Sequence, residues 1–273
     1  DTYRVLLMVW APEALFASFS TILNAGDEVI IPTPAFGLYE ALVQLQGGVP
    51  VSLPTEHNHF QIVPEELKAA ITDRTKAIIL TSPNNPTGCV YTKETLDAVH
   101  AILQDKPIFV LCDDVYRTLT YCEDYHSFAE YQDMRDRIIV VQSFSKPYAM
   151  TGWRLGYVIA PPEVSDRIRK VHDFLTVGAA APLQEAAVVG LRFGDDYYKW
   201  LRDKYTHMRT LFLDGLDRIG ITHNVPQGAY YVMVDVSEFG YSSDLKLCEA
   251  LAQYVGVGAV PGSSFFREPE NRY

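Results

Sequence analysis

The chain has 273 residues, of which 48% are hydrophobic and 21% are charged, and its formal net charge at pH 7 is −11. These values predict a globular protein with a substantial core, built as one large domain or as a large domain plus a small one. The acidic balance argues against nucleic acid as the main partner, because a phosphate backbone requires a basic surface. No apolar run approaches the roughly 18 residues that indicate a membrane span, so no membrane association is expected.

Cysteines and histidines give no sign of a metal or disulfide framework. The four cysteines contain no Cys-x-x-Cys pair; they are Cys89, Cys112, Cys122 and Cys248. With no secretory signal recognised, we expect a reducing, cytoplasmic setting. His57-Asn58-His59 has the spacing of a metal pair, but a solvated loop is the favoured interpretation because the sequence offers no third ligand.

Short apolar runs alternate with longer helical patterns through the first 160 residues. Strands are predicted at 5–10, 27–32, 49–53, 77–81, 108–112, 138–141 and 155–160. Helices are predicted at 13–23, 36–46, from Pro64 onward, and over 92–103 with Thr92 as the N-cap. This alternation predicts an α/β fold, with a mainly parallel sheet and helices on both faces.

From Pro162 onward the pattern becomes mainly helical. Helices are predicted over 162–174, 183–193, 197–219 and 243–254, with strands over 228–234 and 257–260. We therefore expect a large domain over residues 1–205 and a small α/β C-terminal domain over residues 206–273. The boundary falls inside the long helix.

Polar residues follow three of the predicted strands. Asn85 follows one strand, Asp113 another, and Ser143 and Lys146 a third. In sheets of this kind ligands bind at the carboxyl ends of the strands. The sequence therefore predicts that these residues share one site.

The segment from Ser143 to Tyr157 carries the most specific pattern. It contains Lys146 among small and hydroxyl residues, and Arg154 eight positions later. A lysine of this kind can attack a carbonyl when it is neutral, and arginine offers a planar fork for phosphate oxygens. Taken alone, a Ser-x-x-Lys pattern is more often a solvated lysine, with the arginine paired to a surface acid.

The residues Ser-Phe-Ser-Lys, followed by Met-Thr-Gly-Trp-Arg-Leu-Gly-Tyr, resemble the cofactor-lysine segment of the class I/II aminotransferases. These are fold type I pyridoxal-phosphate enzymes of the aspartate aminotransferase superfamily. Asn85-Pro86-Thr87-Gly88 and the Asp113-x-x-Tyr116 pattern resemble motifs of the same family. The resemblance implies an amino acid:2-oxo acid aminotransferase that works as a homodimer. It would use a ping-pong mechanism through an internal aldimine between Lys146 and pyridoxal 5′-phosphate.

The resemblance also assigns roles to single residues. Lys146 would be the covalent anchor and would move the substrate proton, and Asp113 would pair with the pyridine nitrogen. Tyr116 and Asn85 would bind the ring 3′-oxygen, and the Asn85-Pro86 bond would be cis. The phosphate would be bound by Ser143, Ser145 and Arg154, and the ring would lie between Phe36 and Val115. Read without the family, Asp113 is equally well a solvated loop acid, Asn85 a turn former, and Phe36 and Val115 ordinary core residues.

Two features depart from the family pattern. The phosphate-binding turn falls at Trp10-Ala11-Pro12-Glu13, where proline has no N–H, so Ala11 is the main expected backbone donor. The sequence also lacks the N-terminal arm and stops before the strand that carries the family's arginine for the substrate carboxylate. We therefore expect a chain truncated at both ends, with an incomplete C-terminal domain.

Two other functions remain open at this point. A carbon–sulfur β-lyase of the cystathionine-cleaving kind shares these motifs, and a non-catalytic domain that senses pyridoxal phosphate shares the fold. The sequence does not identify the amino acid or oxo acid substrates.

Overall fold

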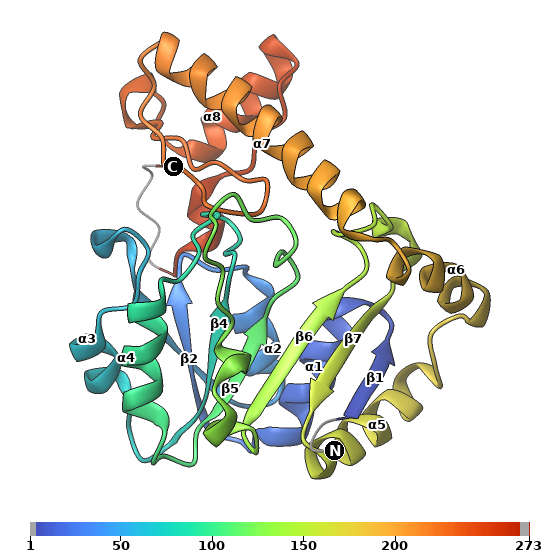
Figure 1. Cartoon of the computed structure of the whole chain (residues 1–273). Helices are drawn as coiled ribbons and strands as arrows, with labels where there is room; N and C mark the ends of the chain where they lie inside the picture. The colour runs from blue at the N-terminus through green and yellow to red at the C-terminus, as the bar shows by residue number, and fades with distance from the viewer. Residues whose placement is uncertain (1–3, 268–272) are drawn as a thin grey trace.

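One sheet of seven strands forms the centre of the computed structural model, which describes residues 4–267 and residue 273 (Figure 1). The strand order is β1-β7-β6-β5-β4-β2-β3. All neighbours are parallel except β7, which is antiparallel to both β1 and β6. The strands are β1 (Arg4–Met8), β2 (Glu28–Thr33), β3 (Val49–Pro54), β4 (Thr75–Thr81), β5 (Phe109–Asp113), β6 (Ile138–Ser143) and β7 (Gly156–Ala160).

The strands bury side chains on both faces of the sheet. Along β4, Ile78 and Leu80 point into one core and Ala77 and Ile79 into the other, as the two-residue period of a strand requires. One core is covered by α1 (Trp10–Ile22), α2 (Leu38–Leu45) and α5 (Pro162–Thr176), and the other by α3 (Pro64–Ala70) and α4 (Lys93–Leu103). The predicted α/β class, with helices on both faces, is confirmed.

A capping residue sets the start of α4, and a side chain within α1 bonds back to the residue before that helix. Thr92 is the N-cap of α4, and its hydroxyl accepts a hydrogen bond from the backbone N–H of Thr95 at 3.2 Å. Such a cap is worth about 1 kcal/mol. The first helix begins at Trp10, three residues before its predicted start, because the Glu13 carboxylate accepts the Val9 N–H and Pro12 suits a first turn.

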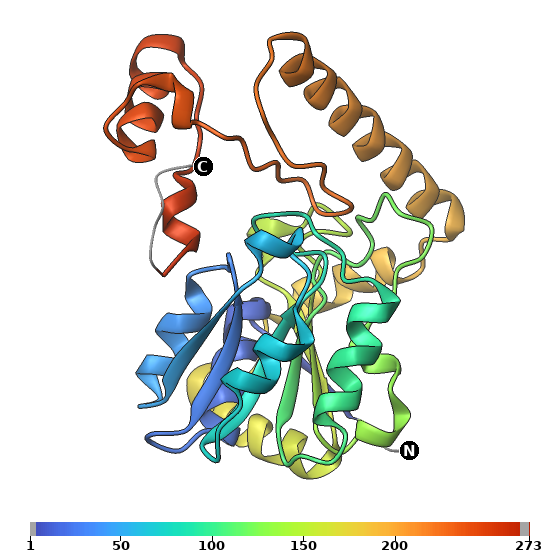
Figure 2. The same ribbon diagram turned by 90° about the vertical axis from the view of Figure 1, so that its left-hand side faces the viewer.

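The last third of the chain lies at the carboxyl end of the sheet. It contains α6 (Ala181–Leu191), the long α7 (Asp195–Arg218), α8 (Asp244–Ala250) and a π-helical turn (Leu251–Val255). Figures 1 and 2 show α7 running away from the sheet, with the following residues returning above it. Short 3-10 turns occupy Glu56–Asn58, Phe128–Glu130, Gln132–Met134, Thr151–Trp153, Ser237–Phe239 and Gly262–Phe265.

The strands predicted over 228–234 and 257–260 are not formed. Residues 228 and 234 make only isolated bridges, to Thr120 and His223. The backbone of the first segment bonds to loops instead: the Ala229 N–H donates to the Leu119 carbonyl at 2.8 Å. Apolar runs become strands only where a neighbouring ladder satisfies their backbone groups, and the described residues provide none here. The β component of the small C-terminal domain is thus not confirmed.

The division into residues 1–205 and 206–273 stays a prediction, and its boundary falls inside the continuous helix α7. Within residues 4–267, no helix is both long enough and apolar enough to cross a membrane.

Candidate active site

A cavity of about 220 Å³ opens where β4, β5 and β6 end and α1 begins. It brings together eight of the ten predicted site residues, namely Ala11, Phe36, Asn85, Asp113, Val115, Tyr116, Ser143 and Lys146. The carboxyl ends of parallel strands meet at one edge of the sheet, so residues far apart in the sequence become neighbours. Trp10 and Pro12, from the predicted phosphate-binding turn, also line the cavity, and the lining residues that sequence reasoning missed are Leu15, Tyr39, Thr81 and Tyr231.

Lys146 lies three residues beyond the end of β6 and is half-buried. Its Nζ donates a hydrogen bond to the Tyr230 hydroxyl at 2.6 Å. The same nitrogen is 5.3 Å from the ring centroid of Tyr116 and 5.2 Å from that of Tyr230. Within the described residues the Lys146 nitrogen therefore bonds to a hydroxyl and faces aromatic rings instead of pairing with a carboxylate, so no ion pair has to break before it bonds to an incoming carbonyl.

Asp113 ends β5 and is buried, with 5% of its surface exposed. The Tyr39 hydroxyl donates to Oδ2 at 2.7 Å, and the Val115 N–H donates to Oδ1 at 3.4 Å. Burial raises the pKa of Asp113 to about 6, against the opposing effects of these two donors and of the Lys146 charge. An acid with that pKa is mostly ionised at neutral pH, so Asp113 presents a buried carboxylate to the cavity. The interpretation as a solvated loop acid is wrong.

Tyr39 was missed because its spacing on α2 reads as core packing. Its hydroxyl lies 3.0 Å from the Thr81 Oγ1 and 2.7 Å from the Asp113 carboxylate. A buried tyrosine must find a polar partner for its hydroxyl, which was the one available signal. Tyr39 thus fixes the orientation of Asp113.

Tyr116 contributes to an aromatic wall of the cavity. Its hydroxyl lies 2.6 Å from that of Tyr231, and burial raises its pKa far above the usual range. Tyr230 and Tyr231 belong to the segment that was predicted as a strand. Because that segment was treated as part of a sheet, neither tyrosine was predicted as a neighbour of Lys146.

The Asn85-Pro86 peptide bond is cis, as predicted. The adjacent Asn84 forms the turn: its Oδ1 accepts the Thr87 N–H at 3.1 Å and the Thr87 hydroxyl at 3.0 Å. Because Asn84 provides the turn bonds, the side chain of Asn85 is left to line the cavity.

The predicted phosphate ligands include donors that lack partners. The Ser143 hydroxyl accepts the Ser145 N–H at 3.0 Å. The Ser145 Oγ and the Arg154 Nη2 are buried and have no hydrogen-bond partner among the described residues. Burial also lowers the pKa of Arg154. A hydroxyl and a guanidinium are donor types that bind anions such as a phosphate.

Ser145 and Arg154 are the two predicted ligands that do not line the cavity. Arg154 lies behind it, with its guanidinium carbon 3.6 Å from the ring centroid of Trp10. Trp10, Ala11 and Pro12 form the first turn of α1 at the cavity, which is the position predicted for the phosphate-binding turn.

Phe36 and Val115 both line the cavity. Phe36 packs edge-to-face on Tyr39, with ring centroids 5.9 Å apart. Their placement on opposite faces of a bound ring stays a prediction.

A larger cavity of about 740 Å³ lies between α7 and residues 226–232. Its lining is mainly apolar, and Arg209 is the single charged side chain among the lining residues. It lacks a nucleophile paired with an acid, so the smaller cavity is the chemical site.

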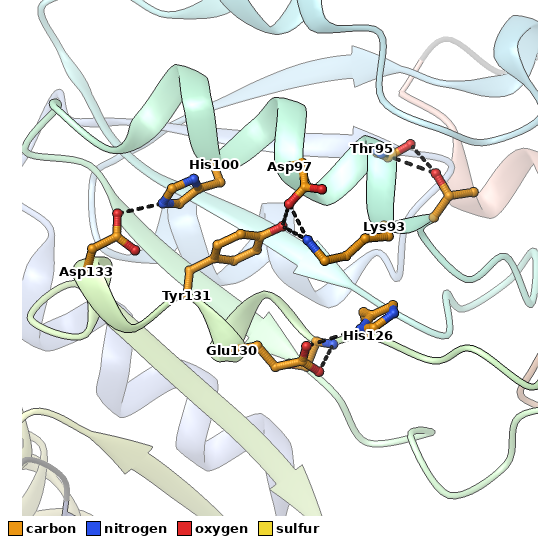
Figure 3. Close-up of polar contacts among 10 residues, drawn as sticks. Lys93, Thr95, Asp97, His100, His126, Glu130, Tyr131 and Asp133 are labelled. Carbon is orange, nitrogen blue, oxygen red and sulfur yellow. Dashed lines mark hydrogen bonds and ion pairs between the residues drawn. The ribbon is translucent and has the colours of Figure 1, made fainter.

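A polar network on the surface of α4 holds the loop at residues 121–134 in place (Figure 3). The Tyr131 hydroxyl donates to Asp97 at 2.6 Å, and Lys93 forms an ion pair with the same carboxylate. His100 stacks on Tyr131 at 4.3 Å and contacts Asp133 at 2.7 Å.

The same loop supports the residues next to the site. The Ser127 hydroxyl donates to the buried Asp114 at 2.7 Å, and the Tyr125 hydroxyl donates to the Ser82 carbonyl at 3.0 Å. His57, from the histidine pair, contacts Glu66 at 3.0 Å instead of a third ligand. Within residues 4–267 and 273, no group of three potential ligands could hold a metal ion.

A lysine amine and a buried carboxylate thus share one cavity at the sheet edge, and two of the predicted phosphate ligands have unpaired donor atoms. Residues 4–271 match the family "Aminotransferase class I and II". The chain is 39% identical to a putative aminotransferase of Bacillus subtilis over 96% of its own length and 68% of the relative's. It is 35% identical to the aspartate aminotransferase of Geobacillus stearothermophilus over 96% of its length and 69% of the relative's.

Solved structures agree with the sequence comparison. A methionine aminotransferase of Escherichia coli has a TM-score of 0.92 at 32% identity, with coverage of 98% of this chain and 70% of the other. N-succinyldiaminopimelate aminotransferase of Mycobacterium tuberculosis has a TM-score of 0.93 at 30% identity, with coverage of 98% and 71%. The chain belongs to the class I and II aminotransferases, enzymes that transfer amino groups with pyridoxal 5′-phosphate. It spans about two thirds of the length of these relatives.

Proposed function

We propose that this chain binds pyridoxal 5′-phosphate through Lys146 and exchanges an amino group between an amino acid and a 2-oxo acid, in two half-reactions. The observation that carries the proposal is the shared cavity of Lys146 and Asp113, with Asn85 and Tyr116 on its wall. The cofactor supplies an electron sink for the substrate Cα.

Lys146 is proposed to hold the cofactor aldehyde and to move the proton at the substrate Cα. Its half-buried position and its bond to the Tyr230 hydroxyl, instead of to a carboxylate, support this role. Asp113 is proposed to face the pyridine nitrogen and to keep that nitrogen protonated. Its burial and its fixed orientation by Tyr39 support this role, because a buried anion stabilises a facing cation.

Asn85 and Tyr116 are proposed to bind the ring oxygen, and Phe36 and Val115 to pack on the ring. The phosphate is proposed to bind Ser143, Ser145, Arg154 and the Ala11 N–H. The unpaired Ser145 Oγ and Arg154 Nη2 support this assignment, because a hydroxyl and a guanidinium both donate readily to phosphate oxygens.

Covalent capture can be tested without turnover. The purified chain is incubated with pyridoxal 5′-phosphate, reduced with borohydride and digested. We expect mass spectrometry to find the cofactor on Lys146. An adduct on another lysine, or no adduct, would contradict the proposal.

The reaction type is tested with a panel of amino acids and 2-oxoglutarate. New amino acid indicates amino transfer. Pyruvate and ammonia released from a cysteine thioether would indicate the β-lyase alternative. A bound cofactor without turnover would support the sensing alternative.

A homodimer is proposed for the same chain. An exposed apolar surface at the end of α5 supports it, where Phe174 is 94% exposed and Val177 is 83% exposed. Large apolar patches on a surface commonly mark association sites. Sedimentation equilibrium should give the mass of two chains, and Phe174→Glu should shift the protein toward one.

We propose a cytoplasmic location, which the four free cysteines support. We also propose the division into a large cofactor-binding domain at residues 1–205 and a small domain at residues 206–273. Limited proteolysis that cuts first within or just after α7 would support that boundary.

A further inference from the structure

The turn that opens α1 has an unusual backbone. Trp10 has a φ of 73°, a left-handed conformation that residues other than glycine rarely adopt. Such a conformation persists only where the surroundings hold it. Trp10, Ala11 and Pro12 all line the cavity that contains Lys146 and Asp113. The shape of this turn therefore sets one wall of the site.

Glu13 is the side chain that holds the turn. Its Oε2 accepts the N–H of Val9, directly before Trp10. Its Oε1 lies 2.7 Å from the His172 Nδ1 and accepts the Thr176 hydroxyl at 3.0 Å. The side chains of Glu13 and His172 are each 10% exposed, so the pair is largely shielded from water. Both His172 and Thr176 belong to α5, so Glu13 ties the turn to a second helix.

The other side of the turn rests against the sheet. A Cβ on Gly156 would lie 2.9 Å from the Trp10 carbonyl carbon and 3.0 Å from the Ala11 nitrogen, which is too close for any side chain. On the same side, the Arg154 guanidinium carbon is 3.6 Å from the Trp10 ring centroid. The turn is thus held between β7 and the carboxylate of Glu13. A loss of that carboxylate would free it to move.

We propose that Glu13 and His172 are positioning residues for the cofactor phosphate. They hold Trp10 and Ala11 so that the Ala11 N–H and the stacked Arg154 face the place where the phosphate binds. Neither residue touches the reacting atoms. This inference rests on the proposed function, since it assumes that the cavity binds pyridoxal 5′-phosphate.

The test compares pyridoxal 5′-phosphate with pyridoxal, which has the same ring and aldehyde but no phosphate. Dissociation constants are measured by absorbance titration for the wild-type chain, Glu13→Ala, Glu13→Gln and His172→Ala. We expect Glu13→Ala to weaken binding of the phosphorylated form by about 10- to 100-fold, the size of effect that supporting groups have at metal sites. It should change pyridoxal binding by no more than about twofold, because pyridoxal has no phosphate. His172→Ala should act in the same direction with a smaller effect. Glu13→Gln should restore most of the preference, because its amide oxygen can still accept the Val9 N–H.

Ser165→Ala is the matched control. Ser165 is also a buried polar residue of α5, and its hydroxyl bonds to the Ala160 carbonyl at 3.0 Å, away from Glu13. It should lower the melting temperature and leave the ratio of the two dissociation constants unchanged. A Glu13→Ala protein that loses both ligands equally, or that keeps the wild-type ratio, would overturn the inference. A wild-type chain that does not prefer the phosphorylated form would instead overturn the proposed function.

Discussion

The chain contains two lysine–aspartate–tyrosine sets that differ in their surroundings: Lys146, Asp113 and Tyr39 at the cavity, and Lys93, Asp97 and Tyr131 on the surface of α4. In both sets the tyrosine hydroxyl donates to the aspartate, at 2.7 Å in the cavity and at 2.6 Å on the surface. The lysines differ. Lys93 forms an ion pair with its aspartate, whereas Lys146 bonds to a tyrosine hydroxyl.

The pKa values of the two aspartates differ because Asp113 is buried and Asp97 is exposed. Hydrogen bonds from Lys93 and Tyr131 lower the pKa of Asp97, whereas burial raises the pKa of Asp113 to about 6. The surface set satisfies its charges internally and is screened by water. The cavity set keeps its amine and its carboxylate apart and ready for a ligand. Residue types alone therefore do not distinguish a reactive site from a surface network.

The largest difference in transamination rate is expected between substitutions of the two lysines, Lys146 and Lys93. Lys146→Ala should remove covalent cofactor binding and lower the transamination rate by at least about 10²- to 10⁴-fold, because the proton carrier at the substrate Cα is lost. Lys93→Ala should leave the rate unchanged. Activity assays, with absorbance spectra of both proteins, check the pair. An active Lys146→Ala protein with the wild-type spectrum would mean that another lysine holds the cofactor.

The two aspartates provide the next comparison. Asp113→Asn should retain cofactor on Lys146 and lower the rate by roughly 10²-fold or more, because a neutral amide does not stabilise a protonated ring nitrogen. Asp97→Asn, which changes the same functional group on the surface, should leave the rate within about twofold, because single exposed ion pairs contribute little. Equal rates for the two variants would remove Asp113 from the proposed mechanism.

Buried acids should also control how stability depends on pH. Burial raises the pKa of Asp114 to about 7, as it raises that of Asp113 to about 6. Between pH 4 and 7 these two carboxyls therefore bind more protons in the folded cofactor-free chain than in the unfolded chain, so their contribution to the free energy of unfolding falls as the pH rises. Asp114→Asn should match the wild-type stability near pH 4 and exceed it at pH 8 by about 2 to 4 kcal/mol. Thermal melts over this range test the sign, and parallel curves for the two proteins would contradict it.

The smallest effects on stability and activity are expected for substitutions of the two tyrosines, Tyr39 and Tyr131. Tyr39→Phe should cost about 1 to 3 kcal/mol of unfolding free energy, because it removes the buried donor to Asp113 and a partner of Thr81. It should also move the acid limb of the pH–rate profile to higher pH, since the Tyr39 hydrogen bond lowers the pKa of Asp113. Tyr131→Phe should change the stability by less than about 0.5 kcal/mol and leave that limb in place. Denaturant titrations and pH–rate profiles of both variants separate these outcomes.

Most of the sheet could be predicted from the sequence. The runs that became β4, β5 and β6 each contain three or four consecutive buried apolar residues and are bounded by turn residues, which is enough to place a buried strand. The same reasoning failed for residues 228–234, because an apolar run says nothing about whether a partner strand exists. A strand is decided by its neighbours as much as by its own residues.

Some residues of the candidate site could likewise be predicted from the sequence, and others could not. The positions of Lys146, Asp113 and Asn85 followed from motifs at the ends of strands, which local sequence encodes. The roles of Tyr39, Tyr230 and Glu13 depended on contacts between segments that lie 74, 84 and 159 residues apart. Only the tertiary structure decided these contacts, because hydrogen-bond partners across the fold leave no periodic signal in either segment.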